Sequence, residues 1–445
     1  MSLLGVPKEY KQTEVGVIPD DWDVKPLSEF ITALEAGVSV NSVERSELST
    51  HDKFILKTSC IFGGYFDPKE AKSILPKDLN RAKLNPRRNS ILVSRMNTPA
   101  LVGEVGFIDD DYANLYLPDR LWQTKYKNDQ SVDGKWLSFI LSFPRVAKKI
   151  KETATGTSNS MKNISKGSFL SVTVPAPKVE EQTAIANTLS DVDALISSLE
   201  KLITKKRAIK TAAMQQLLTG KKRLPPFDKT HTGYKQTELG EIPEDWEVSE
   251  LSQFVENGRL PSGLYKDQSL YGSGTKIIKL GDVFRLDIFD PHAAQRAALT
   301  SEEKRVYKVS IGDIFIALAS VKLEGVGKVM LVKELDEVTV YDHNVALIRS
   351  LKKCDSNYLF YTLKSNAVRS QVKMNATQVG TSFLKASTIL SFELPLPSKN
   401  EQAVIANVLS DMDKEIEVIE QRLTKTQQLK QGMMQELLTG RTRLI

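Results

Sequence analysis

Two segments of the chain carry the most regular pattern of apolar and polar positions. Their apolar side chains recur at alternating steps of four and three residues, at Ile185, Leu189, Val192, Ile196, Leu199 and Ile203, and again at Ile405, Leu409, Met412, Ile416, Ile419 and Leu423. This spacing is typical of a helix with a coiled-coil seam. Pro-x-Pro precedes each segment, and Gly220 or Gly440 ends it. The pattern therefore predicts two helices of about 40 residues, roughly 60 Å each.

Charge along these segments predicts how the helices pair. Residues 180–200 hold five acidic side chains and no basic one, whereas residues 201–223 hold eight basic and no acidic side chains. The second copy has six acidic and one basic in 400–420, then one acidic and five basic in 421–443. Compensation of the helix dipole would also produce such a gradient. Because parallel pairing would place like charges together, we expect an antiparallel pair.

Both segments belong to a long internal repeat. Residues 10–30 and 234–254 share 14 of 21 positions, and residues 175–224 and 395–444 share 24 of 50. The stretches between them hardly agree, so a duplicated framework surrounds two divergent interiors. The repeat predicts an α+β chain with two mixed α/β globular domains and a pair of long antiparallel helices. The expected segments are 1–174 (first domain, cap 10–30), 175–224 (first helix), 225–233 (linker), 234–394 (second domain, cap 234–254) and 395–445 (second helix).

Composition narrows the class of protein. The chain has 445 residues, 41% of them hydrophobic and 26% charged, which is ordinary for globular domains. It lacks the apolar run of about 20 residues that a membrane span needs. Its first residues lack the basic start and long apolar core typical of a secretory leader, so none is expected. The two cysteines and four histidines have no spacing suited to a disulfide framework or a metal site. We expect a cytoplasmic protein without a metal centre or a membrane partner.

The two divergent stretches between the repeated segments, here called the middles (residues 31–174 and 255–394), are basic and contain candidate DNA-binding residues. Their net charges are +6 for residues 31–174 and +4 for 255–394, within +6 for the whole chain. A solvated surface would explain this excess too. Arginine, lysine and asparagine are, however, also the side chains that can contact base edges and phosphates. The candidates in the first middle are Arg87, Arg88, Arg95, Asn97, Arg120 and Lys162. Those in the second are Lys304, Arg305, Lys322, His343, Asn344 and Lys385.

A polar loop closes each middle before the helical segment. One runs from Ala154 towards Lys162 and the other from Ala376 towards Lys385, both rich in Thr and Ser. Such loops are either plain connectors or phosphate contacts made by exposed amides and hydroxyls. The sequence leaves both interpretations open.

No catalytic motif is complete in this sequence. Gly325-Val-Gly-Lys328 lacks the rest of a phosphate-binding loop, and Asn85-Pro86 lacks the second proline and aromatic residue that amino-methyltransferases use. Glu70 and Lys72 lack a nuclease partner carboxylate at the usual spacing. We therefore expect a non-catalytic chain. Trp22 and Trp246 hold equivalent cap positions, where they are predicted to act as hydrophobic anchors.

Taken together, the repeated motifs resemble the specificity subunit of a type I restriction-modification system. The resemblance rests on Pro-x-Pro-x-x-x-Glu-Gln, Ile-Ala-Asn-x-Leu-Ser-Asp-x-Asp, Leu-Leu-Thr-Gly and the cap Ile-Pro-x-Asp-Trp, each present twice. It implies that each middle is a target recognition domain for one half of a split DNA site. It also implies that the helices set the spacing and bind methyltransferase subunits and, through them, restriction subunits. The methyltransferase would use S-adenosylmethionine and the restriction subunit ATP and Mg²⁺, with no cofactor in this chain.

Two further expectations follow from the repeat. Two equivalent frameworks should bind two methyltransferase subunits. The helices should act as a spacer between half-sites centred about 10 base pairs apart. A stand-alone DNA-binding regulator with two tethered readers remains the alternative, while a scaffold without a DNA role would leave the two divergent basic domains unexplained.

Overall fold

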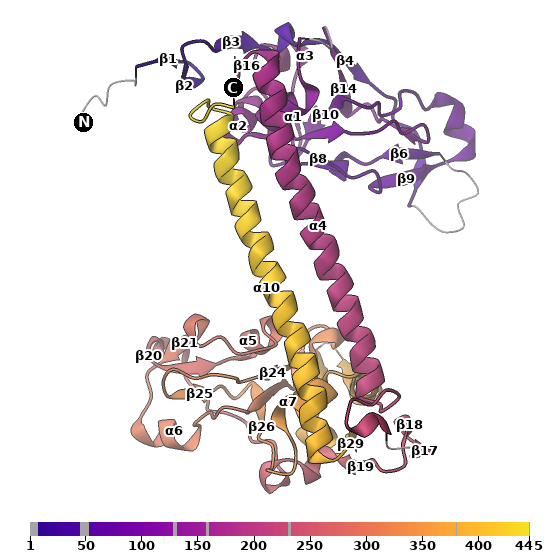
Figure 1. The fold of residues 1–445 in the computed structure, drawn as a ribbon, viewed down its shortest axis with the longest axis vertical. Helices are drawn as coiled ribbons and strands as arrows, with labels where there is room; N and C mark the ends of the chain where they lie inside the picture. The colour runs from indigo at the N-terminus through magenta and orange to yellow at the C-terminus, as the bar shows by residue number, and fades with distance from the viewer. Residues whose placement is uncertain are drawn as a thin grey trace. The chain divides into compact units, whose positions relative to one another are not determined.

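The chain divides into two compact units that share the long helices. The computed structural model describes residues 8–44, 53–127, 131–156, 160–229, 233–379 and 381–444. Unit 1 contains Met1–Leu199 and Arg422–Ile445, and unit 2 contains Glu200–Gln421. Each unit thus includes part of α4 (Val179–Leu217) and part of α10 (Lys399–Leu437) (Figure 1). The domain limits expected from the repeat stay a prediction, and residues 230–232 of the expected linker lie outside the described residues.

Both long helices have the predicted extent and end. Each contains 39 residues and is followed by a turn that reaches Gly220 or Gly440. These glycines have φ of +69° and +70°, in the left-handed region that favours glycine. A Cβ there would collide with Pro243 in one unit and with Pro19 in the other. The glycines therefore end the helices and also allow the caps to approach them closely.

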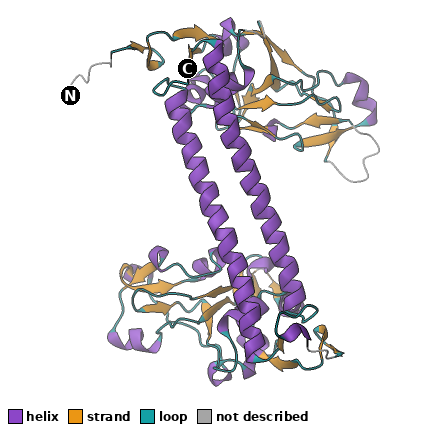
Figure 2. Cartoon of the chain, in the orientation of Figure 1, coloured by secondary structure: helices purple, strands orange, loops and turns teal. Residues whose placement is uncertain are grey.

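Within each unit the two helix segments run antiparallel, as their charges predict. In unit 2, the basic half of α4 meets the acidic half of α10, with Lys206 Nζ 2.6 Å from Glu415 and Arg207 Nη2 2.6 Å from Glu420. In unit 1 the pairing is reversed, because Lys430 of α10 lies 2.6 Å from Asp193 of α4. Figure 2 shows these helices in purple beside the short strands and helices of the globular parts. The antiparallel prediction is confirmed.

Unit 1 combines small sheets with three short helices. The first four-stranded sheet has the order β12-β10-β14-β4 and the second the order β13-β6-β9-β5. The strands of these sheets are Val105–Ile108 (β12), Ser90–Ser94 (β10), Leu121–Tyr126 (β14), Ile31–Ala36 (β4), Leu115–Tyr116 (β13), Phe54–Leu56 (β6), Ala71–Ile74 (β9) and Ser42–Val43 (β5). The remaining strands pair as Tyr10–Thr13 (β1) with Gly16–Pro19 (β2), Asp23–Pro26 (β3) with Thr173–Ala176 (β16), Ile61–Phe62 (β7) with Tyr65–Phe66 (β8), and Met96–Asn97 (β11) with Lys162–Asn163 (β15). The helices are Gly134–Ser142 (α1), Pro144–Glu152 (α2) and Lys166–Leu170 (α3).

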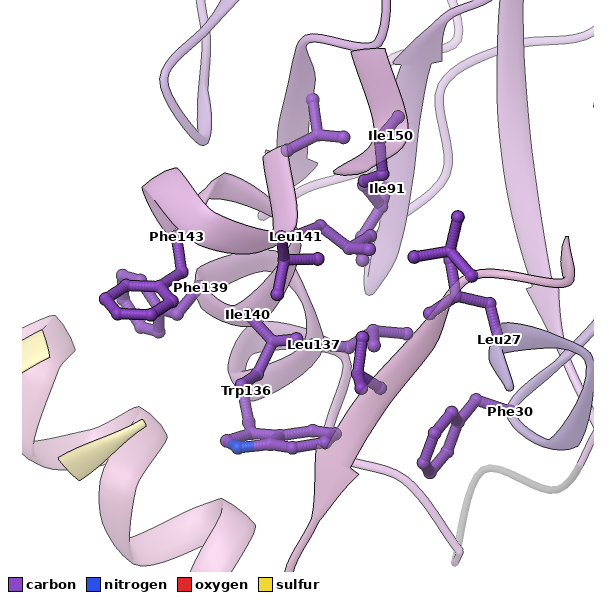
Figure 3. Packing of buried hydrophobic residues seen from close by; sticks show 14 of the residues in the cluster. Leu27, Phe30, Ile91, Trp136, Leu137, Phe139, Ile140, Leu141, Phe143 and Ile150 are labelled. Atoms are coloured by element: carbon purple, nitrogen blue, oxygen red, sulfur yellow. The ribbon is translucent and has the colours of Figure 1, made fainter. Parts of the chain in front are cut away.

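The core of unit 1 forms where α1 packs against the first sheet. Trp136 and Phe30 are both buried, with ring centroids 5.8 Å apart in an edge-to-face arrangement (Figure 3). The same cluster includes Ile185 and Leu189 of α4. The first turns of the predicted helical seam therefore belong to the globular core, which fixes the start of α4 to the domain.

Unit 2 repeats this plan with different interiors. Its three-stranded sheets have the orders β21-β20-β25, β24-β22-β26 and β23-β28-β27. The strands are Gln295–Ala297 (β21), Tyr271–Ile278 (β20), Thr339–Tyr341 (β25), Val329–Leu331 (β24), Ile314–Ala317 (β22), Val345–Ile348 (β26), Ala319–Ser320 (β23), Thr381–Phe383 (β28) and Thr377–Val379 (β27). Two further pairs are Tyr234–Thr237 (β17) with Gly240–Pro243 (β18), and Glu247–Glu250 (β19) with Glu393–Leu396 (β29). The helices are Leu280–Arg285 (α5), Ser301–Val306 (α6), Ser356–Leu363 (α7), Asn366–Asn375 (α8) and Ala386–Leu390 (α9).

One of the two predicted polar loops is a β-hairpin. In unit 2 the segment from Ala376 forms β27 and β28, which pair antiparallel and continue onto β23. The segment therefore has regular structure, because Thr and Phe at these positions suit a pleated strand. Its role as a connector or as a phosphate contact stays a prediction. In the equivalent loop of unit 1, residues 157–159 lie outside the described residues.

The repeated cap and helix motifs form one network in unit 1. The indole N–H of buried Trp22 donates to Glu181 Oε2 at 2.9 Å, and Glu181 is only 1% exposed. Arg443 donates to both oxygens of Glu181, from Nε at 2.7 Å and from Nη2 at 2.9 Å. It also donates to Asp21 at 2.8 and 2.9 Å. The N-terminal cap, the start of α4 and the C-terminal tail are therefore joined by charge-assisted hydrogen bonds around the buried carboxylate of Glu181.

Unit 2 contains the same network one repeat away. Trp246 Nε1 donates to Glu401 at 3.2 Å, and Arg223 donates to Glu401 at 2.8 and 2.6 Å. Arg223 also donates to Asp245 at 3.0 Å. The tryptophans are buried anchors, as predicted, and they are also hydrogen-bond donors to a buried carboxylate. This duplicated network accounts for the conservation of these motifs between the two halves of the chain.

Candidate nucleic-acid interface

Four of the six candidates in unit 1 lie at one edge of the domain, here named the Arg95 edge (residues 95–98, 119–120 and 162–163). The main-chain N–H of Arg95 donates to the carbonyl oxygen of Arg120 at 3.1 Å, and Ile164 donates to the carbonyl oxygen of Arg95 at 2.9 Å. Asn97 and Lys162 are direct partners in the β11–β15 pair. Strand pairing therefore brings together residues that are up to 67 positions apart in the sequence, from 95 to 162.

Arg95 is held with part of its guanidinium accessible. Its Nε–H donates to the carbonyl oxygen of Asp119 at 2.7 Å, and its Nη2 lies 3.9 Å from an Asp119 carboxylate oxygen. Its Cζ is 6.0 Å from the ring centroid of Trp122. The side chain is 28% exposed. An arginine fixed through Nε can still present its two Nη groups as a fork, which is the geometry that guanine accepts.

The other members of the Arg95 edge differ in what their side chains can reach. Asn97 is only 9% exposed, its Nδ2 donates to Ser94 at 3.2 Å, and its Oδ1 accepts from the main chain of Thr98 at 2.8 Å. Lys162 donates to the carbonyl oxygen of Gly156 at 2.6 Å. Both side chains therefore stabilise the edge from within. Arg120 is exposed and suits an outward contact.

Arg87 and Arg88 lie at the opposite end of β10 from Arg95. Both are exposed, and their main-chain N–H groups donate to the side chains of Gln123 and Asp111. The five residues of β10 span about 16 Å at roughly 3.3 Å per residue. The structure therefore does not bring these two arginines to the Arg95 edge.

Unit 2 has an equivalent edge, named the Asn344 edge (residues 318–322, 342–344 and 382–385). Here Ala317 pairs with Val345, Ala319 pairs with Phe383, and Leu384 donates to the carbonyl oxygen of Leu318 at 2.8 Å. These bonds bring together four of the six candidates of unit 2, which are Lys322, His343, Asn344 and Lys385. Lys322 and Lys385 are both exposed.

His343 and Asn344 surround a buried carboxylate. Asp342 is 3% exposed, and its Oδ1 lies 3.3 Å from Nδ1 of His343. The same oxygen accepts from the main chain of Asn344 at 2.8 Å and from its Nδ2 at 2.7 Å. The ring of Tyr265 meets His343 edge to face, with centroids 4.9 Å apart. His343 and Asn344 are therefore held in a polar cluster by the buried carboxylate of Asp342.

Lys304 and Arg305 lie on α6, which does not contribute a strand to the Asn344 edge. Both are exposed, and Arg305 donates to Glu302 of its own helix at 2.6 Å. The helix is tied to the edge indirectly, because Glu303 bonds Lys266 at 2.7 Å, next to Tyr265. That lysine holds the pKa of the Glu303 carboxyl below its usual range through a hydrogen bond.

The sequence did not single out the residues that orient these edges. Asp119 supports Arg95, Asp342 supports Asn344, and Tyr265 covers His343. A signal for the first two exists, since an acidic residue lies immediately before Arg120 and before the His343-Asn344 pair. Tyr265 gives no such signal, because only the folded chain brings it beside residue 343. Within the described part of the chain, no helix combines the length and apolarity of a membrane span.

Two divergent domains on a duplicated framework, each with an edge of potential base-reading side chains, are the features of a two-part recognition protein. The chain belongs to the type I restriction modification DNA specificity domain family, whose model matches residues 19–210 and 243–428. The two matches correspond to the two copies of the repeat.

Individual relatives align along nearly the whole chain. It is 26% identical over 432 residues to the type I restriction enzyme MjaVIII specificity subunit of Methanocaldococcus jannaschii, covering 96% of this chain and 94% of that protein. The type I restriction enzyme EcoKI specificity subunit of Escherichia coli K12 is 22% identical over 452 residues, covering 96% of this chain and 90% of that protein. The crystal structure of the type I restriction-modification S subunit from M. genitalium matches with a TM-score of 0.56 at 15% identity, covering 94% of this chain and 96% of that one. This structural likeness supports the fold.

Proposed function

We propose that this chain is the DNA-recognition subunit of a type I restriction-modification enzyme, in which each unit reads one half of a bipartite site. The observation that carries the proposal is the pair of equivalent edges, which have the same strand scaffold but different outward side chains, Arg95 and Arg120 in one and His343 and Asn344 in the other. A shared scaffold with different readers gives two independent half-site specificities. The family assignment excludes the alternative of a stand-alone regulator.

The chain supplies the sequence specificity and its partners supply the chemistry. Two methyltransferase subunits would bind the two copies of the framework, because repeated surfaces present equivalent docking sites. Restriction subunits would join through them. The methyltransferase would use S-adenosylmethionine and the restriction subunit ATP and Mg²⁺, and the complex would work in the cytoplasm, where it reaches cellular DNA.

The shared helices would set the spacing between the half-sites. Each unit contains part of both helices, so a change of helix length acts on both units. Inserting four residues near Met214 adds about 6 Å if the helix continues. The unread spacer of the modified site should then lengthen by one or two base pairs while both half-sites stay the same. An active complex with an unchanged spacer would contradict this role.

The central test uses the chain together with the methyltransferase of its own system. Native mass measurement should give two methyltransferase subunits per chain, and sequencing of modified adenines should give one bipartite motif. Exchange of residues 31–174 for those of a relative should change one half of the motif. A saturating ratio of one partner per chain would contradict the two-site docking, and a change in both half-sites would contradict independent reading.

A further inference from the structure

Asn344 occupies a place in unit 2 that an arginine occupies in unit 1. It directly precedes β26, as Arg120 directly precedes β14. The two strands pair with β22 and β10 in the same way, through Val345 with Ala317 and Leu121 with Ser94. The two residues are therefore equivalent in the fold. An asparagine and an arginine differ in the base they can read by paired hydrogen bonds, adenine for the first and guanine for the second.

The amide of Asn344 has a fixed orientation. Asp342 Oδ1 accepts from Asn344 Nδ2 at 2.7 Å and from its main-chain N–H at 2.8 Å. A carboxylate oxygen accepts hydrogen bonds, so the amide nitrogen faces Asp342 and the amide oxygen is directed away from it. One N–H of the amide is used by Asp342, and Nδ2 also lies 3.5 Å from Nδ1 of His343, at the long limit of a hydrogen bond. The amide oxygen is available to a ligand, and a ligand acceptor can replace this long, exposed contact of the second N–H.

The backbone that carries Asn344 is also held in place. The hydroxyl of Ser262 donates to the carbonyl oxygen of His343 at 2.8 Å, and the main chain of His343 donates to Leu264 at 3.0 Å. Tyr271 donates to the second oxygen of Asp342 at 3.1 Å. Burial raises the pKa of the Tyr271 phenol to about 12, and this bond to Asp342 acts in the same direction. The phenol therefore stays a donor, and Asp342 is restrained at both oxygens.

Asn344 remains open to a large ligand. It is exposed, and beside it the ring of Tyr265 is 73% exposed while it contacts His343. Lys322 and Lys385 lie on the same edge with exposed ammonium groups, which suit phosphates. A fixed amide on an edge that also carries exposed lysines is a favourable arrangement for reading a base in a groove whose phosphates the lysines could contact.

We propose that Asn344 reads one adenine of the half-site of unit 2, with its Oδ1 accepting from the adenine N6–H and its second Nδ2–H donating to N7 in place of the long contact with His343. Asp342 is the positioning residue that fixes the amide. The inference rests on the proposed function, because it assumes that the Asn344 edge enters a groove of the DNA. It adds which residue reads and which base is read.

The test couples one side chain to one atom of the base. The complex with the methyltransferase binds duplexes of its own motif, in which each adenine in turn is replaced by 7-deazaadenine, which lacks N7. At one position this replacement should weaken binding by the wild-type complex by about 5-fold, since one hydrogen bond of the pair is lost. Asn344→Ala should weaken binding to the full motif by about 5- to 140-fold and should make that position insensitive to 7-deazaadenine.

Two further variants separate reading from folding. Asp342→Asn should lower discrimination at the same adenine while binding to unrelated duplex stays at the wild-type level, which a merely misfolded edge would not do. Asn366→Ala, at an exposed asparagine that begins α8, should leave the whole 7-deazaadenine profile unchanged. If Asn344→Ala still binds its motif specifically and every adenine position keeps its wild-type sensitivity to 7-deazaadenine, the inference is wrong while the proposed function stands. A wild-type complex that binds all duplexes equally overturns the proposed function and this inference with it.

Discussion

Asp193 and Lys430 form an ion pair between α4 and α10, with Nζ 2.6 Å from Oδ1. The hydroxyl of Tyr65 donates to the same carboxylate oxygen at 2.5 Å. Unit 2 repeats the pair with Asp413 and Lys210, where Tyr361 donates to Asp413 at 2.7 Å. The aspartates and lysines are identical in the repeat, whereas the tyrosines come from β8 and α7. Each globular domain is thus fixed to its helix pair at the same point by a tyrosine of different origin.

Removal of either tyrosine hydroxyl should loosen one domain only. Tyr65→Phe should destabilise unit 1 by about 1.5 kcal/mol, because a hydrogen bond to a charged acceptor is lost while the ring remains. Hydrogen exchange should show faster opening in residues 54–126 and no change in unit 2, and Tyr361→Phe should show the reverse. Tyr116→Phe is a matched control, since no hydrogen bond of its hydroxyl occurs within the described residues. Equal effects of either variant on both units would contradict the assignment.

Loss of Arg443 should destabilise unit 1 strongly. Glu181 is buried, and Arg443→Ala would leave it with the indole N–H of Trp22 as its remaining side-chain donor. Breaking a buried ion pair from one side costs about 3 kcal/mol or more. Thermal or urea unfolding should show this loss, and Arg223→Ala should produce the same loss in unit 2. Arg441→Ala, two residues away and exposed, should change stability by less than about 0.5 kcal/mol.

Acid should weaken the same network through Asp21. The hydrogen bond from Arg443 holds the pKa of the Asp21 carboxyl below its ordinary value of 3.8. A carboxyl with a lowered pKa in the folded state stabilises the fold above its unfolded pKa, and this contribution is lost as the pH falls through the folded pKa. The difference in stability between wild type and Asp21→Asn should therefore be constant near neutral pH and shrink below about pH 4. A difference that grows on acidification would contradict the sign of the effect.

Arg95 should read a guanine in the half-site of unit 1. Arg95→Lys keeps the charge and loses the fork, so discrimination should fall by about 1 to 3 kcal/mol at one position. Competition binding with single base-pair replacements measures this change. Arg87→Lys, at the other end of β10, should alter no single position selectively. If Arg95→Lys leaves discrimination at every position of both half-sites intact, Arg95 is not a reader.

The framework could be predicted from the sequence because its signals are local or repeated. The helix ends follow from Pro-x-Pro and from Gly220 and Gly440, and the antiparallel pairing follows from charge. The hydrogen bond from Trp22 to Glu181 could not be predicted as a contact, since it joins residues brought together only by the closed fold. Both residues nevertheless recur as identities of the repeat, as does Arg443, so the repeat marked them as important without showing why.

The accessibility of the candidate residues was harder to predict from the sequence than the framework. Residue type alone selected Arg95, Asn97 and Asn344 equally, yet Asn97 is buried and bonded within its own turn while Asn344 is exposed. The difference depends on local position, because Asn97 lies within β11 whereas Asn344 lies in the turn before β26. In irregular two-residue strands such as β11 the alternation of faces is too brief to be read from the sequence.

The bond between Arg443 and Glu181 has a consequence for how the chain folds as it is made. Unit 2 is a continuous stretch, Glu200–Gln421, so all its contacts are available once that stretch has been synthesised. Unit 1 begins first, but it lacks the contacts made by the end of α10 and the tail after it until residues 422–445 emerge. At about 5 to 20 residues per second, the intervening segment of unit 2 takes roughly 10 to 45 s to translate. During that time Glu181 lacks its arginine partner, so the domain that is synthesised first is completed last, once residues 422–445 have emerged from the ribosome.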